Sequence, residues 1–209
     1  MKINAKTLFS DAQKEKIRQA VQAAERSTRG EIMVMLVDES DPYREAEFAG
    51  ASSLSALAAL LLSAALQLTS IWFYIPVTVV LFVPFLILFK RCPHLKLALL
   101  TRNRVDEAVK ERAVYAFFQK GVHMTDEQTG ILIFISVLER KVWILADRGI
   151  HGKIAPHVWN SLAREVANGI KEDRAFDALC AVIRKCGAEL TRHFPGAHSP
   201  KPPADGVLC

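Results

Sequence analysis

Residues 48–89 read FAGASSLSALAALLLSAALQLTSIWFYIPVTVVLFVPFLILF and contain no charged side chain, although charged residues stand immediately on both sides. A transmembrane helix needs about 20 mostly apolar residues, so this run is long enough for two spans. Its most polar point is the sequence QLTS at residues 67–70. The run therefore predicts a transmembrane hairpin, with spans over about residues 48–66 and 71–89.

The first span carries a ridge of small side chains. Ala51, Ser55, Ala59 and Ser63 recur every four residues, which places them on one face of a helix. Small residues let two helices approach closely in lipid, where van der Waals packing drives association. We expect the second span to pack on this ridge. The alternative is self-association through the ridge, or contact with another membrane protein.

The flanks of the hairpin predict its orientation. The basic residues beside the spans are Arg44, Lys90, Arg91, Lys96, Arg102 and Arg104. Because positively charged loops stay on the cytoplasmic side, we expect both soluble ends in the cytoplasm. No Asp, Glu, Lys, Arg or His lies within either span, which favours an anchor over a transporter. Residues 1–16 lack the apolar core of a cleaved signal peptide.

The composition limits the classes of function that can be expected for the rest of the chain. About 165 residues lie outside the hairpin, which is enough for one domain with its own core. The net charge of +5 is accounted for by the basic residues beside the spans, so the expected partner is the lipid bilayer and not nucleic acid. The cysteines Cys92, Cys180, Cys186 and Cys209 form no CxxC pair, and we interpret them as core or incidental residues.

The residues before the hairpin predict a helix and a strand. Ser10, with Gln13 three positions later, forms a capping-box pattern. The apolar residues that follow at helical spacing are Ile17, Ala20, Val21 and Ala24. We expect Gly30 to end this helix as a C-cap. Residues 31–37 (EIMVMLV) have the length and composition of a buried strand.

Three further helices are predicted after the hairpin. An apolar stripe at helical spacing covers residues 105–117 and stops at Gly121. Two more stripes cover residues 154–166 and 176–190. Gly169 is expected to interrupt the helical run between these two stripes.

Two strands lie between these helices. Residues 130–137 (GILIFISV) form a continuous apolar run, typical of a central strand covered on both faces, and residues 141–146 follow after a short turn. A strand, a crossover with a helix and a second strand run parallel, so residues 31–37 and 130–137 should pair in that direction. The predicted fold class is α/β, with a small mixed sheet sandwiched by helices and interrupted by a two-helix transmembrane hairpin.

The hairpin is expected to interrupt one domain rather than to join two. Its ends emerge together on one side of the bilayer, so it can sit in the crossover as a large insertion. We therefore predict a single discontinuous cytoplasmic domain from residues 1–44 and 93–195, with the hairpin region over residues 45–92. Residues 196–209 contain three prolines and are expected to be a loose tail.

This element order resembles the TPM domain family. The stretches that carry the resemblance are RGEIMVML (29–36), TGILIFISVLERKVWILADRGI (129–150) and ANGIKEDRAFDALCAVIRKCGAELTRHFP (167–195). The resemblance implies an α/β sandwich, often tethered to a membrane, here the bacterial inner (plasma) membrane as a multi-pass protein. It also implies phosphatase activity with divalent metal binding, or a role in assembly or repair of membrane protein complexes. The family's acidic Asn-Gly entry to the second strand is replaced here by DEQTG at residues 126–130.

The predicted strand directions gather carboxylates at one edge of the sheet, away from the bilayer. Glu31 begins the first strand, Asp126 and Glu127 precede the second, and Asp147 follows the third. Hard cations take oxygen ligands, so these four residues are the candidate ligands for Mg or Ca. The alternative is that they are solvated residues at strand ends. Asp38, Glu39, Arg140 and Lys141 gather at the opposite edge, which is expected to face the membrane.

Other catalytic signatures are absent from the sequence. His151 and His157 flank the start of a helix, but neither HExxH nor CxxC spacing accompanies them. The sequence also contains no GxSxG or GxxxxGK[ST] motif. Two hypotheses remain. The first is a membrane-anchored interaction or assembly module, and the second is a phosphatase that uses carboxylates and a metal ion.

Overall fold

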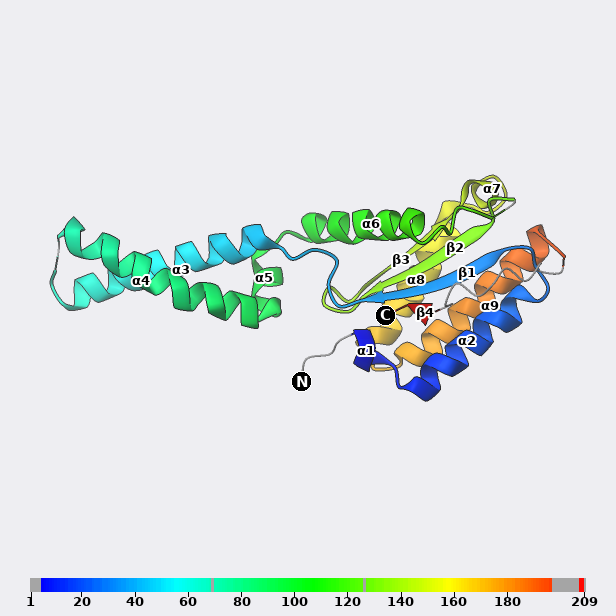
Figure 1. Ribbon diagram of the computed structural model, residues 1–209, viewed down its shortest axis with the longest axis horizontal. Helices are drawn as coiled ribbons and strands as arrows, with labels where there is room; N and C mark the ends of the chain where they lie inside the picture. Colours follow the sequence, from blue (N-terminus) through cyan, green and yellow to red (C-terminus); the bar gives the residue numbers. More distant parts are fainter. Residues whose placement is uncertain (1–4, 69, 126, 197–206, 209) are drawn as a thin grey trace. The chain divides into compact units, whose positions relative to one another are not determined.

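The computed structural model describes residues 5–68, 70–125, 127–196 and 207–208, and the chain forms two compact units (Figure 1). The first unit contains residues 1–40 and 106–209, and the second contains residues 41–105. In sequence, the second unit is therefore inserted into the first.

A sheet forms the centre of the first unit. Its strands are β1 (Glu31–Val37), β2 (Gly130–Ser136), β3 (Lys141–Ala146) and β4 (Val207–Leu208), in the order β3-β2-β1-β4. β1 pairs parallel with β2, and β2 pairs antiparallel with β3, which confirms the predicted crossover and strand hairpin. β4 pairs parallel with β1 and belongs to the predicted tail, most of which lies outside the described residues.

Alternation along the strands divides the hydrophobic core between the two faces of the sheet. Every residue of β2 is buried. Ile131, Ile133 and Ile135 belong to one cluster, and Leu132 and Phe134 belong to the other. Successive side chains of a strand point to opposite faces, so a continuously apolar strand needs cover on both sides. The prediction of a doubly covered central strand is confirmed.

Helices supply this cover on both faces. The larger cluster takes side chains from α2 (Asp11–Glu25), α8 (Pro156–Lys171) and α9 (Ala175–His193). The smaller cluster takes side chains from α6 (Arg102–Gln119), which are Val109, Ala113, Ala116 and Phe117. Figure 1 shows α2 and α9 side by side against the sheet. The α/β class, with a small mixed sheet between helices, is therefore confirmed.

Two local predictions about α2 have different outcomes. The capping box is present, because Ser10 Oγ accepts from the Gln13 N–H (3.3 Å) and Gln13 Oε1 accepts from the Ser10 N–H (2.9 Å). The prediction that Gly30 ends this helix is wrong, because α2 ends at Glu25. A Cβ atom on Gly30 would lie 2.8 Å from Leu190 of α9, so the missing side chain permits this close approach.

The predicted break at Gly169 is also wrong. α8 continues through Gly169 to Lys171, and the chain reverses at residues 172–174, where Asp173 has a φ of +55°. A Cβ atom on Gly169 would collide with the Ala178 side chain of α9. The glycine therefore serves the packing of two helices and does not end the first one.

The second unit is built on the two helices α3 (Arg44–Ala65) and α4 (Ile71–Arg91), which pack along each other. Both are long and apolar enough to cross a membrane, and the turn between them coincides with the predicted polar break. Ala51, Ser55 and Ala59 of the small-residue ridge are fully buried, and Ser63 is half-buried. Because α4 is the long helix packed on α3, the ridge is covered within the hairpin.

Three short helices were not predicted. They are α1 (Ala5–Leu8), α5 (Pro93–Leu99) and α7 (Arg148–His151). α5 belongs to the second unit, beyond residue 92, where the predicted hairpin region ends. The predicted boundaries of the soluble domain stay a prediction.

Candidate functional site

The strand directions bring distant segments together at one edge of the sheet. Glu31 lies opposite Gly130 in the register of β1 and β2. The Asp147 N–H, just after β3, donates to the Gly130 carbonyl (2.9 Å). Thr129 Oγ1 donates to the Arg29 carbonyl (3.2 Å). These described segments therefore meet at the edge of the sheet that the strand directions predicted. We name this edge, which contains Glu31, Thr129, Gly130 and Asp147, the entry edge.

The four predicted metal ligands have different surroundings. Glu31 is half-buried at the start of β1. Glu127 forms an ion pair with Arg29. Asp147 is 8% exposed, and its Oδ1 accepts from the first N–H of α7 (2.7 Å) as the N-cap. Asp126 lies outside the described residues.

The three described candidates, Glu31, Glu127 and Asp147, do not by themselves form a site for a hard cation. Mg and Ca take several oxygen ligands at once. Within the ranges that the structure describes, no three His, Cys, Asp or Glu side chains stand close enough to share a metal ion. Glu127 is already paired with Arg29. The Mg or Ca site stays a prediction that depends on Asp126.

A pocket of about 490 Å³ opens beside the entry edge. Its aromatic and charged lining residues come from α6, the loop after it and the end of β3 with α7; they are Phe117, Phe118, His123, Asp147, Arg148 and His151. Two of these carry a buried polar atom for which the described residues offer no hydrogen-bond partner, namely Asp147 Oδ2 and His123 Nδ1. Buried polar atoms are nearly always paired, so these two atoms need a partner from outside the described residues, either an ordered water or a bound group.

Three rings form the aromatic wall of this pocket. Phe117 and Phe118 meet edge to face, with centroids 5.6 Å apart and planes at 88°. The His123 ring lies 5.1 Å from the Phe118 centroid and 6.4 Å from that of Phe117. The three rings and the buried Asp147 carboxylate therefore line the same pocket.

Exposed apolar side chains lie on the helix and the loop that line this pocket, and one of them, Phe118, lines the pocket itself. Tyr115 is 56% exposed, Phe118 57% and Met124 64%, and we name these three residues the apolar rim. In the described part of the first unit they are the exposed large apolar side chains. The sequence held a signal for them, because Tyr115 and Phe118 lie off the apolar stripe that predicted α6.

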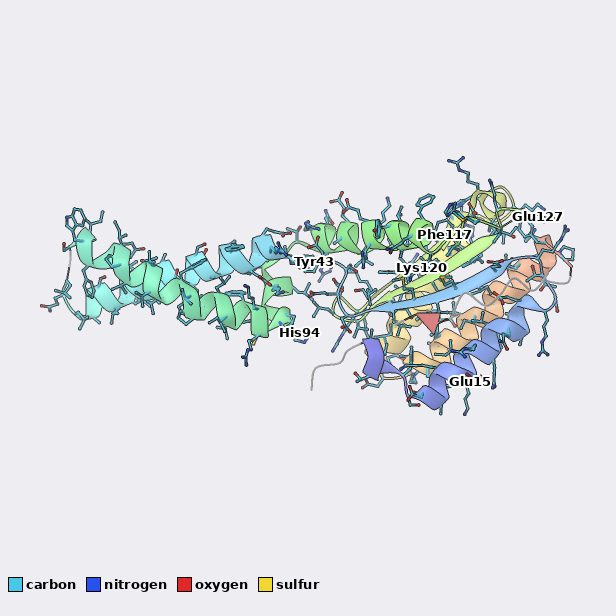
Figure 2. The ribbon with its side chains drawn as sticks, in the orientation of Figure 1. Glu15, Tyr43, His94, Phe117, Lys120 and Glu127 are labelled. Atoms are coloured by element: carbon cyan, nitrogen blue, oxygen red, sulfur yellow. The ribbon has the colours of Figure 1, made fainter. Side chains whose placement is uncertain are left out.

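Sequence reasoning missed most of this pocket. Of the two histidines considered as a base, His151 lines it, whereas His157 lies elsewhere on the surface. His123 was not considered, because a single histidine after a helix carries no motif. Figure 2 shows Phe117, Lys120 and Glu127 near the same end of the first unit.

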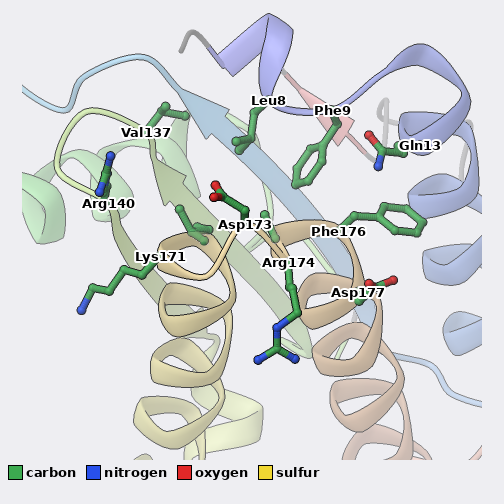
Figure 3. Close-up of a pocket in the computed structure, with 12 residues that line it drawn as sticks. Leu8, Phe9, Gln13, Val137, Arg140, Lys171, Asp173, Arg174, Phe176 and Asp177 are labelled. Carbon is green, nitrogen blue, oxygen red and sulfur yellow. The ribbon is translucent and has the colours of Figure 1, made fainter. Parts of the chain in front are cut away.

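A second pocket, of about 350 Å³, lies at the opposite end of the strands (Figure 3). Leu8 and Phe9 form an apolar wall, and Lys171 and Arg174 extend away from them. Arg174 forms an ion pair with Glu172. Since no unpaired buried polar atom lines this pocket in the described residues, it is the weaker candidate.

The base of the hairpin holds a buried ion pair. Lys96 Nζ lies 2.5 Å from Glu47 Oε1, and both side chains are less than a tenth exposed. The same ammonium group donates to the Pro42 carbonyl (3.2 Å). A buried pair of this kind specifies one arrangement, because separating the charges leaves each without compensation.

A second cluster lies beside this pair. The Arg104 guanidinium contacts Asp41 Oδ2 (3.0 Å) and Glu45 Oε1 (2.9 Å). Burial by itself would raise the pKa of Asp41, but hydrogen bonds from the Tyr43 N–H and from Arg104 outweigh burial and lower it. The pKa of Arg104 is raised, chiefly by its hydrogen bond to Asp41. Both charges are therefore retained at neutral pH.

The described cysteines of the first unit, Cys180 and Cys186, are not poised for chemistry. Burial raises the pKa of Cys186 to about 12, and burial also raises the pKa of Cys180. The thiolate is the reactive form of cysteine, so neither residue is suited to act as a nucleophile at neutral pH. Cys92, in the second unit, is half-buried.

The fold and the entry edge define an α/β sandwich with a small mixed sheet. Residues 90–189 match the sequence model of the TPM domain. The match begins at the end of α4, whereas α2 and β1, which complete the sandwich, precede the hairpin.

One solved structure shares this fold. It is the NMR structure of the BA42 protein from the psychrophilic bacterium Bizionia argentinensis, with a TM-score of 0.57 and 17% sequence identity. The alignment covers 96% of this chain and 94% of that one. At this identity the likeness concerns the fold alone. None of the curated proteins compared with the chain matches it.

Proposed function

We propose that this protein is a membrane-anchored TPM domain that serves as an interaction or assembly module for a membrane protein complex. The observation that carries the proposal is the apolar rim of Tyr115, Phe118 and Met124 beside the pocket of about 490 Å³. Contiguous exposed apolar side chains on a domain are typical of a contact surface. Aromatic residues and methionine are also enriched in the centres of protein interfaces.

The surface of the hairpin supports the anchor. The outward residues of α4 are large and apolar, with Trp72 84% and Val80 70% exposed. Exposed apolar area costs about 25 cal/mol per Å² in water, and a bilayer removes that cost. The basic flank from Lys90 to Arg104 favours an orientation with both soluble ends in the cytoplasm, at the bacterial inner membrane.

The orientation is tested by labelling Cys209 in intact cells. A Cys92→Ser background removes the half-buried thiol, and burial protects Cys180 and Cys186. A membrane-impermeant maleimide should label Cys209 only after lysis. Equal labelling rates in intact and lysed cells would show that the orientation is wrong.

The interaction is tested by purifying the full chain from its own membrane in mild detergent. A membrane protein should co-purify in stoichiometric amount. Phe118→Ser and Met124→Ser should reduce it at least about tenfold, because interface energy concentrates in a few apolar side chains. Glu15→Ala, at an exposed position of α2, is the control and should retain the partner. If no stoichiometric partner co-purifies, the proposal is wrong.

The second candidate function is a metal-assisted phosphatase, as the resemblance to the TPM family implies. The buried Asp147 carboxylate in a pocket that also contains Arg148 is the observation in its favour. This function requires a bound Mg or Ca, which should raise the melting temperature by mass action. Asp126→Asn combined with Asp147→Asn should abolish that rise. An unchanged wild-type melting temperature in millimolar Mg or Ca would exclude this function.

A further inference from the structure

We propose that the pocket beside the entry edge binds the guanidinium group of an arginine side chain from the partner protein. The inference rests on the proposed function, since it names the chemistry by which an interaction module would hold its partner. The apolar rim then packs around the inserted side chain, and the pocket supplies the specificity.

The first argument is the unpaired carboxylate oxygen. Asp147 is 8% exposed, and its Oδ1 is used by the N-terminus of α7. No described residue donates to Oδ2. A buried charged acceptor without a donor is costly, so a ligand that donates a hydrogen bond there gains more than it would at the surface.

The second argument is the other unpaired atom. His123 Nδ1 is buried, lines the same pocket and has no partner among the described residues. In the neutral ring with the proton on Nε2, Nδ1 is an acceptor. A guanidinium group has five N–H donors in a plane, so one such group can donate to more than one acceptor.

The third argument is the aromatic wall. The rings of Phe117, Phe118 and His123 have centroids 5.1 to 6.4 Å apart and form one side of the pocket. Guanidinium planes stack on aromatic faces, and the ring quadrupole attracts cations. A carboxylate beside aromatic rings is therefore complementary to an organic cation.

The other ionisable groups at the pocket do not reverse this preference. Arg148 and His151 line it from α7, and both are exposed residues. Arg148 contacts Asp147 through its backbone N–H, and no described side chain neutralises Oδ2. A phosphate or carboxylate ligand would meet the unpaired carboxylate at short range and be repelled.

The test uses the full chain in lipid nanodiscs and n-propylguanidinium as the probe. Saturation-transfer NMR should detect binding of n-propylguanidinium but not of the neutral n-propylurea or of inorganic phosphate. Asp147→Asn keeps a capping oxygen for α7 and removes the charge, so it should weaken binding at least about tenfold. Phe118→Leu should weaken it about two- to fivefold through the lost ring. Asp177→Asn, which removes an exposed carboxylate at the second pocket, is the matched control and should bind like wild type.

Several results would overturn the inference. Equal binding of n-propylguanidinium to wild type and Asp147→Asn is one, and preferential binding of phosphate is another. A melting temperature that rises with Mg or Ca in wild type but not in Asp147→Asn would assign the carboxylate to a metal ion instead.

Co-purification separates this inference from the proposed function. Loss of the partner in both Phe118→Ser and Asp147→Asn supports both. If Phe118→Ser loses the partner and Asp147→Asn retains it, the arginine inference fails and the interaction module stands. If no partner co-purifies with wild type, the proposed function is wrong. The inference that a partner's arginine binds in the pocket is then wrong as well, even if n-propylguanidinium binds.

Discussion

The two units bury opposite kinds of side chain. In the first unit, large apolar residues such as Phe134 and Ile133 are fully buried, and the exposed positions are mostly polar. In the second unit, most buried residues of α3 are small, such as Ala51, Ser55 and Ala59, and most large apolar residues of α3 and α4 are exposed, although Tyr43 and Phe89 are buried. The size of the buried side chains therefore differs between the sheet of the first unit and the helix pair of the second.

This is the difference expected between a unit that folds in water and a helix pair that packs in lipid. In water, removal of apolar area is the main driving force, so large apolar side chains fill the core. In lipid that force between helices is absent, and close packing of small residues takes its place. A bilayer around α3 and α4 would produce this contrast. It can be tested with substitutions whose expected effects differ between the two units.

The largest effect is expected from removing the second unit. Replacing residues 41–105 with a short flexible linker should give a soluble, cooperatively unfolding protein, because the sheet and its covering helices lie in the first unit. Sedimentation and a thermal melt provide the measurement. Insolubility or a non-cooperative melt would show that the second unit is part of the core of the first.

The next effect is expected in β2. Phe134→Ala removes a fully buried ring and should lower the free energy of unfolding of the first unit by about 3–5 kcal/mol. Val80→Ala, at an exposed position of α4, should change stability by less than about 0.5 kcal/mol. Urea titration in mild detergent measures both. Similar losses for the two variants would contradict the comparison.

The third-largest effect on stability is expected from the buried ion pair at the base of the hairpin. Lys96→Met leaves the Glu47 carboxylate buried without its cation, which should cost about 3 kcal/mol. The double variant Glu47→Leu with Lys96→Met should recover most of this loss, since no charge remains buried. SDS titration followed by circular dichroism measures the stability of each. A double variant as unstable as the single one would show that the pair itself stabilises the base.

The small-residue ridge provides a more modest test. Ala59→Leu forces a larger side chain between α3 and α4 and should cost about 1–3 kcal/mol by overpacking. Ala64→Leu makes the same change at an exposed position of α3 and should have little effect. The same SDS titration compares the two. Equal effects would mean that the ridge is not the packing surface.

The smallest effect concerns pH at the base of the hairpin. The pKa of Asp41 is lowered in the folded state, so its stabilisation is present above the unfolded value near about 3.9 and is lost as pH falls through the lower folded value. The contribution should be below about 1 kcal/mol, because the pair is about a third exposed. Hydrogen exchange of residues 41–45 between about pH 2 and pH 5 should show an acid-induced loss of protection in wild type. Asp41→Asn should show a smaller one, and identical profiles would contradict the assignment.

Much of the fold was predictable from local pattern. The two apolar helices, the Ser10 capping box and the directions of β1, β2 and β3 are confirmed. The failures concern glycines. Gly30 and Gly169 were interpreted as helix ends, but each permits close packing with a residue of α9 that is not adjacent to it in the sequence. Local pattern cannot separate these two uses of glycine, because the neighbour that requires the missing side chain is not adjacent in sequence.

The candidate site was predictable only in part. Topology placed Glu31 and Asp147 at one edge, as the structure does. It did not reveal that Glu127 is paired with Arg29 or that His123 stands beside Phe118. Such pairings depend on side-chain rotamers and on loop paths, which carry no periodic signal.

The sequence by itself determined the hairpin, the order of the elements and the edge at which the carboxylates meet. Hydrophobic length, periodicity and the handedness of crossovers are properties of short segments and of chain connectivity, so they are readable without coordinates. Only the tertiary structure decided which polar atoms remain unpaired and where an apolar rim lies beside a cavity. Pairing and burial are set by every neighbour in space at once, and those neighbours come from segments far apart along the chain.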